Sequence, residues 1–591
     1  MLDPPMRRRW AGLVVLAVVA AVLETVGTGA VFGLISVVAD TDSLGRLPLV
    51  GSMLIELAHR DHTIAIIAVG AAVVVFFVGK NAFVLFQIYN QERTAFATTS
   101  QATSMLMRGY LHISYAFHFH RNSAQLIQTL EFAVDDTFRV SLLSAVVMTS
   151  EIFIASGLAL VLVISEPMIS LVTALVLGCL MLAVYKGTNR VFAEIGRHVQ
   201  VLAAKLVQAM QQGLGAVKEV KILGRESFFC DSYADLYRQR AQRQVQAAVL
   251  QQAPRLATET LMVGGMVLII ALVVLGGGDR AAVMPTLGLF GYAGFRLQPS
   301  LNRIVLYLNN IAKGGAAAAM LAKDWPALSA AAASPLTHPE PLPFTDRLTL
   351  DDVHYTYPGG DREVLRGISL DIPRGEALGI VGTTGAGKST LVDLILGLLD
   401  PTGGRVLVDG TDIARDPRAW QRKIGYVPQV IYLTDDTLRH NIAFGLGDDE
   451  IDEARVRRAL EMAQLAEFID GLPQGLETRV GERGLNLSGG QRQRIGVARA
   501  LYSEPELLVF DEATSALDAE TEREVSRAID TLSGSKTVIL IAHRLSTLKN
   551  CDRIVFLKDG KVAGMGSHRE LAATNADFRR MAELSAPQSV V

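Results

Sequence analysis

"LGIVGTTGAGKSTLVDLI", residues 378–395, decides the fold of the second half of this 591-residue chain. The stretch is typical of an apolar strand, a glycine-rich loop and the start of a helix. It matches G-x-x-x-x-G-K-[ST], in which glycines let backbone N–H groups wrap around phosphates. The N-terminus of the following helix adds a dipole that favours anions. The loop residues predicted to bind a nucleoside triphosphate are Gly382, Thr383, Thr384, Gly385, Ala386, Gly387, Lys388, Ser389 and Thr390.

Within that loop, Lys388 is expected to reach the outer phosphates and the Ser389 hydroxyl to bind Mg²⁺. A second motif, "ELLVFDEATSALD" at 506–518, is an apolar strand that ends in two carboxylates, Asp511 and Glu512. Two carboxylates at the end of a buried strand indicate a site that binds a cation and a water molecule. We therefore predict that Asp511 supports Mg²⁺ and that Glu512 polarises the attacking water.

A third motif, "LNLSGGQRQRIGVARAL" at 485–501, places small residues before an amphipathic basic helix. A hydroxyl and backbone N–H groups at a helix N-terminus form another phosphate-binding surface. Two such surfaces in one domain favour ATP held between two copies of the domain. The residues of this motif predicted to bind ATP are Ser488, Gly489, Gly490 and Gln491.

With these motifs, the chain from about residue 344 resembles the ABC transporter ATPases. The resemblance implies that Tyr357 stacks on adenine and that Gln429 senses Mg²⁺ and the membrane domain. It also implies that "SALD", 515–518, is the dimer-contacting D-loop and that His543 contacts the γ-phosphate. "VGERG" at 480–484 matches a segment found near the coupling helices of exporters. The implied cofactors are ATP and Mg²⁺, with Ser389, Gln429 and Asp511 around the metal.

Composition divides the chain into two parts. The chain is 50% hydrophobic and only 19% charged, whereas soluble chains carry about 25% charged residues, so part of it lies in lipid. The net charge of −3 gives no basic excess for nucleic acid. A Pro-, Ala- and Ser-rich stretch at 326–343 is predicted to be a linker. It separates a transmembrane domain, 1–325, from an α/β nucleotide-binding domain, 344–591.

The apolar first part predicts six membrane-spanning helices, since a span needs about 20 apolar residues. A cleaved signal peptide is the alternative for the first run, which contains Glu24 and is long for a signal. The basic start, Arg7 to Arg9, places both termini in the cytoplasm by the positive-inside rule, and we expect the inner membrane. The expected spans are 10–39, a stretch from Thr63, 140–164, 168–187, 256–275 and 283–309.

Two long polar stretches, 91–138 and 188–255, continue these spans as cytoplasmic helices. Their far ends, 114–130 and 212–229, mix aromatic, basic and small residues. A solvated hairpin tip is the plain alternative. Beside an ABC ATPase, we interpret both ends as coupling helices that dock on it.

Basic residues at membrane depth indicate the cargo. Intramembrane charges usually face a bundle interior or a wet cavity, and arginine binds phosphate through two parallel hydrogen bonds. Arg296 and Arg303 are seven residues apart and share one helix face. Internal pairing, such as Arg255 with Glu259, is the alternative. The predicted cargo-cavity residues are Lys80, Arg255, Arg296 and Arg303.

The membrane half also resembles the PglK-type flippases, on "LETVGTGAVFGLISV", "FHFHRNSAQLIQTL", "GLGAVKEVKILGRESFF" and "FRLQPSLNRI". That resemblance implies a cargo of polyprenyl-pyrophosphate-linked oligosaccharide. It also implies an external helix that meets the polyprenyl tail, for which 44–60 is the candidate. One six-span domain and one ATPase make half an exporter, so we expect a homodimer, with a heterodimer as the alternative. The rival functions are a broad lipid or multidrug exporter, a peptide exporter and an ATP-gated channel.

Overall fold

A computed structural model describes residues 3–39, 62–119, 121–165, 167–275, 280–334, 339–511, 536–542, 548 and 550–585. Glu512, His543, the 515–518 segment and the candidate external helix 44–60 lie outside the described residues. By contacts the chain forms two compact units. Unit 1 is Met1–Ile113 with His120–Pro335, and unit 2 is Ser114–Phe119 with Leu336–Val591.

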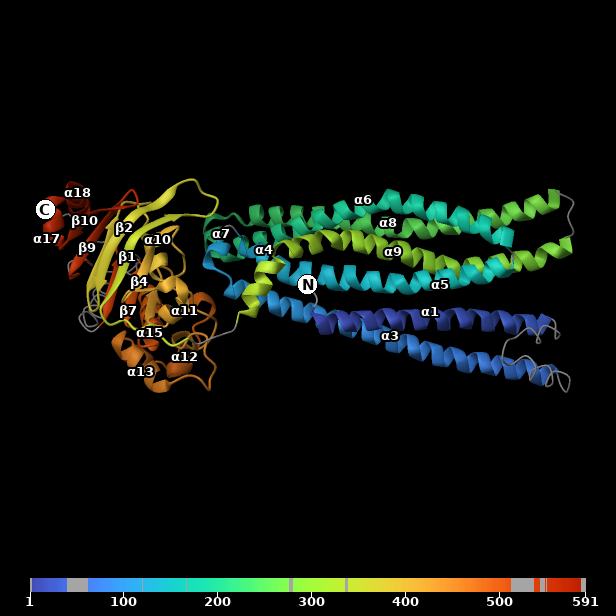
Figure 1. Cartoon of the computed structure of the whole chain (residues 1–591), viewed down its shortest axis with the longest axis horizontal. Helices are drawn as coiled ribbons and strands as arrows, with labels where there is room; N and C mark the ends of the chain where they lie inside the picture. The colour runs from blue at the N-terminus through green and yellow to red at the C-terminus, as the bar shows by residue number, and fades with distance from the viewer. Residues whose placement is uncertain are drawn as a thin grey trace. The chain divides into compact units, whose positions relative to one another are not determined.

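Unit 1 is built mainly of long helices that run side by side (Figure 1). The long helices are α1 (Pro4–Ala39), α3 (His62–His112), α5 (Leu143–Ser165), α6 (Pro167–Gly215), α8 (Glu226–Leu275) and α9 (Arg280–Ala333), and the short helices are α4 (Ser123–Gln128) and α7 (Val217–Leu223). Between α4 and α5 the chain is π-helical at Thr129–Ala133 and Asp136–Leu142. Each expected span lies within a described helix or overlaps one. Helix α9 continues to Ala333, so residues 326–333 of the expected linker are helical.

Length and hydropathy pick out four candidate membrane spans among the described residues. They are Pro4–Val31, Ile66–His112, Ser123–Leu160 and Leu297–Ala333. The other two expected spans fall in α6 and α8, where many side chains are not described. Helices α1, α3, α5 and α9 pack against one another, as do α6, α8 and α9. Close packing depends on glycine at Gly196 of α6, where a Cβ would lie 2.2 Å from the Lys313 carbonyl oxygen of α9.

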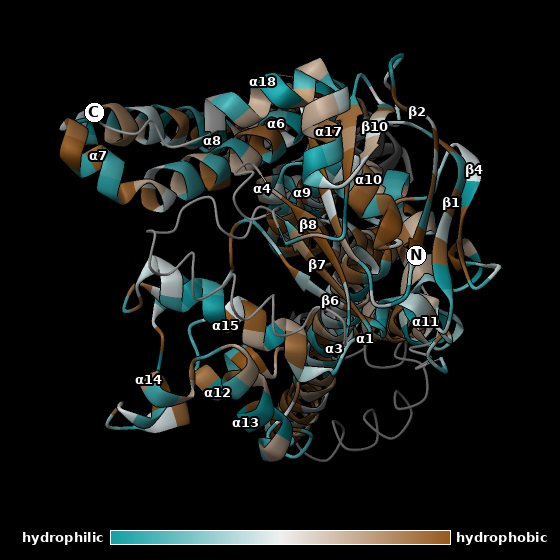
Figure 2. Cartoon of the chain, turned by 90° about the vertical axis from the view of Figure 1, so that its left-hand side faces the viewer, coloured by the Kyte–Doolittle hydropathy of each residue, from teal (hydrophilic) through white to brown (hydrophobic). Residues whose placement is uncertain are grey.

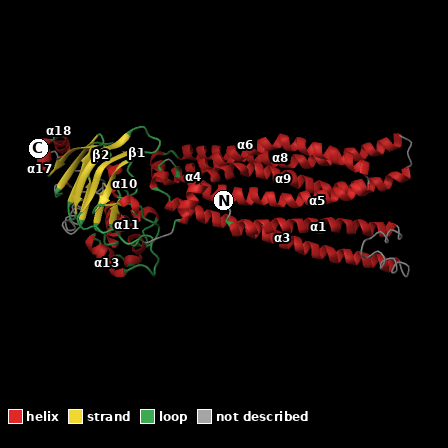
Figure 3. Cartoon of the chain, viewed as in Figure 1, coloured by secondary structure: helices red, strands yellow, loops and turns green. Residues whose placement is uncertain are grey.

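Unit 2 contains two sheets, drawn as yellow arrows in Figure 3. The first has the order β2-β1-β4-β5 and is antiparallel: β1 (Arg347–Thr356), β2 (Glu363–Pro373), β4 (Gly403–Val408) and β5 (Thr411–Asp412). The second has the order β10-β9-β3-β8-β7-β6, with β10 antiparallel at one edge. Its strands are β3 (Ala377–Gly382), β6 (Ile424–Val427), β7 (Leu507–Asp511), β8 (Thr537–Ile541), β9 (Arg553–Lys558) and β10 (Lys561–Gly566).

Strands β3, β7 and β8 are buried along nearly their whole length, as expected for parallel strands covered on both faces. Strands β7 and β8 are brown, and therefore apolar, in the interior of unit 2 in Figure 2. Two apolar clusters form the core, one on each face of this sheet. The main helices are α10 (Lys388–Ile395), α11 (Pro417–Gln421), α12 (Leu438–Ile442), α13 (Glu453–Met462), α14 (Ala466–Asp470), α15 (Gly489–Tyr502), α17 (His568–Thr574) and α18 (Ala576–Ser585).

Candidate ATP site and membrane cavity

The phosphate loop connects β3 to α10. Gly385 and Gly387 have φ of +80° and +97°, a left-handed backbone that favours glycine. A Cβ on Gly382 would lie 2.3 Å from the Leu557 carbonyl oxygen, so glycine is required there for packing against β9. The Lys388 ammonium donates to the Gly382 carbonyl at 3.1 Å, which holds the lysine over its own loop. This geometry fits the phosphates of ATP.

Asp511 lies at the carboxyl end of β7, and Gly382 lies at the same end of β3 in the same sheet, separated by β8. Ligands of parallel sheets bind at that edge. The Tyr426 hydroxyl donates to Asp511 Oδ2 at 3.3 Å. Burial and the nearby Asp511 charge raise the pKa of Asp393 on α10 to about 6. The site therefore carries excess negative charge, which suits a divalent cation such as Mg²⁺.

Tyr357 lies beside this loop. Its hydroxyl is 2.9 Å from the Thr390 hydroxyl of α10, and its ring contacts that of Tyr355 at a centroid distance of 5.0 Å. Within the same unit, the Phe119 ring packs edge-on against Tyr357 at 5.3 Å. The sequence motif predicted a role for Tyr357 but not its contacts with Phe119 and Thr390, because no local pattern connects these three positions.

The second predicted phosphate-binding surface begins with a preformed helix cap. The Ser488 hydroxyl accepts from the Gln491 backbone N–H at 3.2 Å, and the Gln491 side-chain oxygen accepts from the Ser488 N–H at 2.8 Å. This capping box begins α15. Gly489 is exposed, with open space where a Cβ would stand. Gln429, two residues beyond β6, is also exposed.

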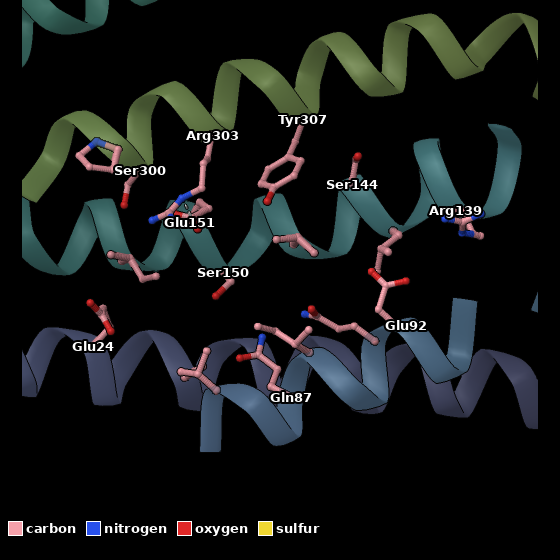
Figure 4. A pocket seen from close by; sticks show the side chains of 18 of the residues that line it. Glu24, Gln87, Glu92, Arg139, Ser144, Ser150, Glu151, Ser300, Arg303 and Tyr307 are labelled. Carbon is pink, nitrogen blue, oxygen red and sulfur yellow. Dashed lines mark ion pairs between the residues drawn. The ribbon is translucent and has the colours of Figure 1, made fainter. Parts of the chain in front are cut away.

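Unit 1 encloses a cavity of about 540 Å³ between α1, α3, α5 and α9 (Figure 4). The Arg303 Nε donates to Glu151 Oε1 at 2.8 Å, and Glu151 is only 6% exposed. The lining mixes charged, amide and hydroxyl groups with aliphatic ones. The polar lining residues are Glu24, Gln87, Gln91, Glu92, Arg139, Ser144, Ser150, Glu151, Ser300, Arg303 and Tyr307.

Of the four predicted cargo residues, the structure places Arg303 in this cavity. Lys80 is buried and donates to Glu24 Oε2 at 2.6 Å, so it pairs internally. Arg255 is exposed and is not among the lining residues. The Arg296 side chain lies outside the described residues. The lining of one chain therefore has three carboxylates and two guanidinium groups, and it is mixed in charge rather than basic.

Comparison of this chain with known protein families and relatives identifies the same two parts. Residues 365–515 match the family model described as ABC transporter, and residues 11–277 match that of the ABC transporter transmembrane region. An ATP-dependent lipid A-core flippase of Cupriavidus metallidurans is 35% identical over 475 residues, which cover 78% of this chain and 77% of that relative. This chain belongs to the ABC transporter family.

Two further similar proteins support the membership in this family. The mouse ATP-binding cassette sub-family B member 10, a mitochondrial protein, is 34% identical over 432 residues, or 70% of this chain and 58% of that relative. The solved structure of a bacterial Atm1-family ABC exporter with ATP bound has a TM-score of 0.76 and 28% identity, and covers 100% of both chains. The expected membrane helical domain followed by an ABC ATPase domain is confirmed, as is the half-exporter architecture.

This ABC transporter is therefore a multi-pass membrane protein whose ATPase domain uses ATP, with Mg²⁺ as the usual partner ion, to drive translocation. The predicted roles of individual residues in the ATP site stay predictions. The PglK-type cargo also stays a prediction, because none of the relatives described above is named as a PglK-type flippase.

The two expected coupling segments differ in their surroundings. Residues 114–119 cluster with unit 2, where the 3-10 turn Tyr115–His118 precedes Phe119. Helix α7 ends at Leu223 and is capped by Gly224, whose φ is +59°. It leaves Val217, Ile222 and Leu223 exposed, the last two by 73% and 68%. Aliphatic side chains this exposed on a short helix suit docking, as the coupling prediction requires.

Proposed function

We propose that this ABC transporter is an inner-membrane homodimer that flips a phosphorylated glycolipid from the cytoplasmic to the outer leaflet. The preferred cargo is a polyprenyl-pyrophosphate-linked oligosaccharide. The observation that carries the proposal is the polar cavity of unit 1, which lies among helices apolar enough to cross a membrane. A cavity for an apolar drug would need few hydrogen-bonding groups.

Arg303 gives the cavity a group that can bind phosphate. Its side chain is 49% exposed although it pairs with Glu151, so one face of the guanidinium is accessible to cargo. Arginine binds phosphate oxygens through two parallel N–H groups. The relatives named lipid A-core flippases support a lipid cargo. Lipid A-core is the second candidate, since it shares phosphate and sugar chemistry with the polyprenyl-linked glycan.

A dimer is supported by the division of the ATP site. Each chain supplies one phosphate loop and one Ser488-capped helix. Our proposal pairs the loop of one chain with the capped helix of the other, so that ATP joins two ATPase domains. The exposed aliphatic side chains of α7 are available to dock on the partner in the same assembly. ATP binding would close the dimer, and hydrolysis at Glu512 would reset it.

Reconstituted flipping tests the proposal. The purified protein is placed in proteoliposomes with a fluorescent glycolipid. ATP and a membrane-impermeant reductant are added outside, so lipid that the protein moves to the lumenal leaflet is protected from quenching. We expect ATP-dependent flipping of the polyprenyl-linked glycan and of lipid A-core, in that order of rate. Flipping of plain phospholipid at the same rate, or ATPase stimulation by drugs or peptides alone, would instead identify a broad or peptide exporter.

A further inference from the structure

An ion pair joins two points of unit 1 that are 203 residues apart in the chain. The two terminal nitrogens of Arg121 donate to the two carboxylate oxygens of Asp324, at 2.5 and 2.7 Å. The side chains of the pair are only 27% and 16% exposed. Two parallel hydrogen bonds make an arginine–carboxylate pair strong and specific in direction, whereas isolated exposed pairs contribute little. The pair therefore fixes the chain at Arg121 relative to α9.

The position of this pair in the chain connects it with the ATPase unit. The chain enters unit 2 at Ser114, leaves it after Phe119 and enters it again at Leu336. Arg121 follows Phe119 by two residues, and Asp324 precedes Leu336 by twelve. Inside unit 1, the pair thus joins the two segments that lead into unit 2.

Close packing holds the end of α9 around the ion pair. Trp325, next to the paired aspartate, packs edge-on against Phe138, with 6.4 Å between the ring centroids. A Cβ on Gly109 of α3 would lie 2.6 Å from the Leu328 carbonyl oxygen of α9, so the two backbones are in contact there. Because packed protein interiors transmit strain, a displacement of the chain at Arg121 will move α9 as a whole.

The contacts on either side of the pair form a continuous route. Within unit 2, the Phe119 ring packs against Tyr357, which is predicted to stack on adenine. Two residues later, Arg121 pairs with Asp324 of α9. The same helix carries Arg303, which lines the cavity. Coupling between distant sites is carried by packed side chains, ion pairs and rigid helices of this kind.

We propose that Arg121 is a positioning residue for ATP-driven translocation, and that its pair with Asp324 transmits occupancy of the ATP site to the cavity wall on α9. Arg121 contacts neither nucleotide nor cargo in this role. It acts through the segment 114–119 and through α9. The inference depends on the coupling of ATP to translocation and not on the identity of the cargo.

Hydrogen–deuterium exchange on the full-length protein in nanodiscs tests the proposal. Exchange of the α9 segment 300–312 is measured with and without Mg²⁺ and a saturating non-hydrolysable ATP analogue. The nucleotide should change the exchange rate of this segment in the wild type. Arg121→Ala should reduce that change by at least about two-fold, a usual effect of mutations along a coupling network. Arg121→Lys keeps the charge but loses the parallel hydrogen bonds, so its loss should be intermediate.

Exchanging the two charges separates coupling from simple stabilisation. Arg121→Asp should lose the nucleotide-dependent change, and Arg121→Asp/Asp324→Arg should recover most of it, because an ion pair can form again at the same place. A pair that only stabilises unit 1 would lower Tm and raise exchange equally with and without nucleotide. The matched control is Arg238→Ala, which removes an ion pair with Asp235 on α8 whose side chains are 68% and 62% exposed.

The control should keep the full nucleotide-dependent change in segment 300–312. The coupling role is overturned by a wild-type segment that does not respond to the nucleotide, or by an undiminished response in Arg121→Ala. A charge-exchanged variant with a wild-type Tm and no recovered response would also overturn it. None of these results depends on which lipid is moved, so they leave the proposed cargo untouched.

Discussion

The Tyr357 hydroxyl lies 2.9 Å from the Thr390 hydroxyl. The aromatic residue predicted to stack on adenine is thereby fixed to the first turn of α10, the helix that follows the phosphate loop. The Phe119 ring also packs edge-on against the Tyr357 ring, with 5.3 Å between the ring centroids. Within unit 2, one hydrogen bond therefore joins the residue predicted to stack on adenine to the helix predicted to bind the phosphates.

Removing the ring and removing the hydroxyl should have different effects. Tyr357→Ala loses stacking, worth about 1–3 kcal/mol per base, so the KM for ATP should rise roughly ten-fold or more with a small change in kcat. Tyr357→Phe keeps the ring and should change the KM by less than about three-fold. Steady-state ATPase assays measure both. Equal effects of the two variants would mean that Tyr357 does not stack on adenine.

The close approach of α6 and α9 makes Gly196 sensitive to substitution. Gly196→Ala forces a Cβ against the Lys313 carbonyl oxygen, for which we expect a loss of about 1–3 kcal/mol of stability. Gly187→Ala is the control on the same helix, where a Cβ meets open space, and alanine improves helix propensity by about 1 kcal/mol. Thermal unfolding in detergent should show a lower Tm for the first variant and an unchanged or higher Tm for the second.

The Lys80–Glu24 pair, in which the lysine is buried and the carboxylate is 21% exposed, should stabilise the packing of α1 on α3. Lys80→Met leaves the Glu24 carboxylate without that ammonium group, and we expect a cost below about 3 kcal/mol, the lower end for fully buried pairs. The double variant Lys80→Met/Glu24→Gln removes both charges and should recover part of the loss. A double-mutant cycle on Tm measures this coupling. If Lys80 instead binds cargo, Lys80→Met will reduce flipping without lowering Tm.

His354 should make the ATPase unit more stable in mild acid. Its Nδ1 is 2.6 Å from Glu363 and its Nε2 is 3.3 Å from Asp352, and the hydrogen bond to Glu363 raises the pKa of His354. A raised pKa contributes stability that is fully present below about pH 6.5 and is lost as pH rises through the folded value. His354→Gln should therefore lower Tm at pH 6 and leave it unchanged at pH 9. A constant difference across that range would argue against the ion pair.

Glu512→Gln tests the assignment of the base. We expect hydrolysis to fall by about 10²–10⁴-fold, the usual effect of a missing general base, while ATP binding persists. Phosphate release and binding of a fluorescent ATP analogue measure the two quantities. Asp511→Asn is the comparison, since it should weaken the Mg²⁺-dependent part of binding as well. Wild-type turnover in Glu512→Gln would remove the base assignment.

The sequence by itself predicts the family of the ATPase half and its main strand-to-loop and loop-to-helix transitions. Glycines, the loop lysine and the strand carboxylates are short-range patterns whose spacing the backbone requires, so Gly382–Thr390 and Asp511 could be placed without coordinates. The apolar runs likewise predicted helices that the structure contains. Local spacing is sufficient in these cases because each motif is a single strand-to-loop or loop-to-helix transition.

Tertiary structure alone decided which charges in the membrane half are available. Lys80, Arg255 and Arg303 are alike in sequence, as basic residues at membrane depth. Lys80 pairs with Glu24, 56 residues away, Arg255 is exposed and does not line the cavity, and Arg303 lines the cavity and pairs with Glu151. Such pairings depend on how α1, α3, α5 and α9 pack, which no local period encodes. The physical reason is that the availability of a charged side chain to a ligand depends on its neighbours in space, and these neighbours come from distant parts of the chain.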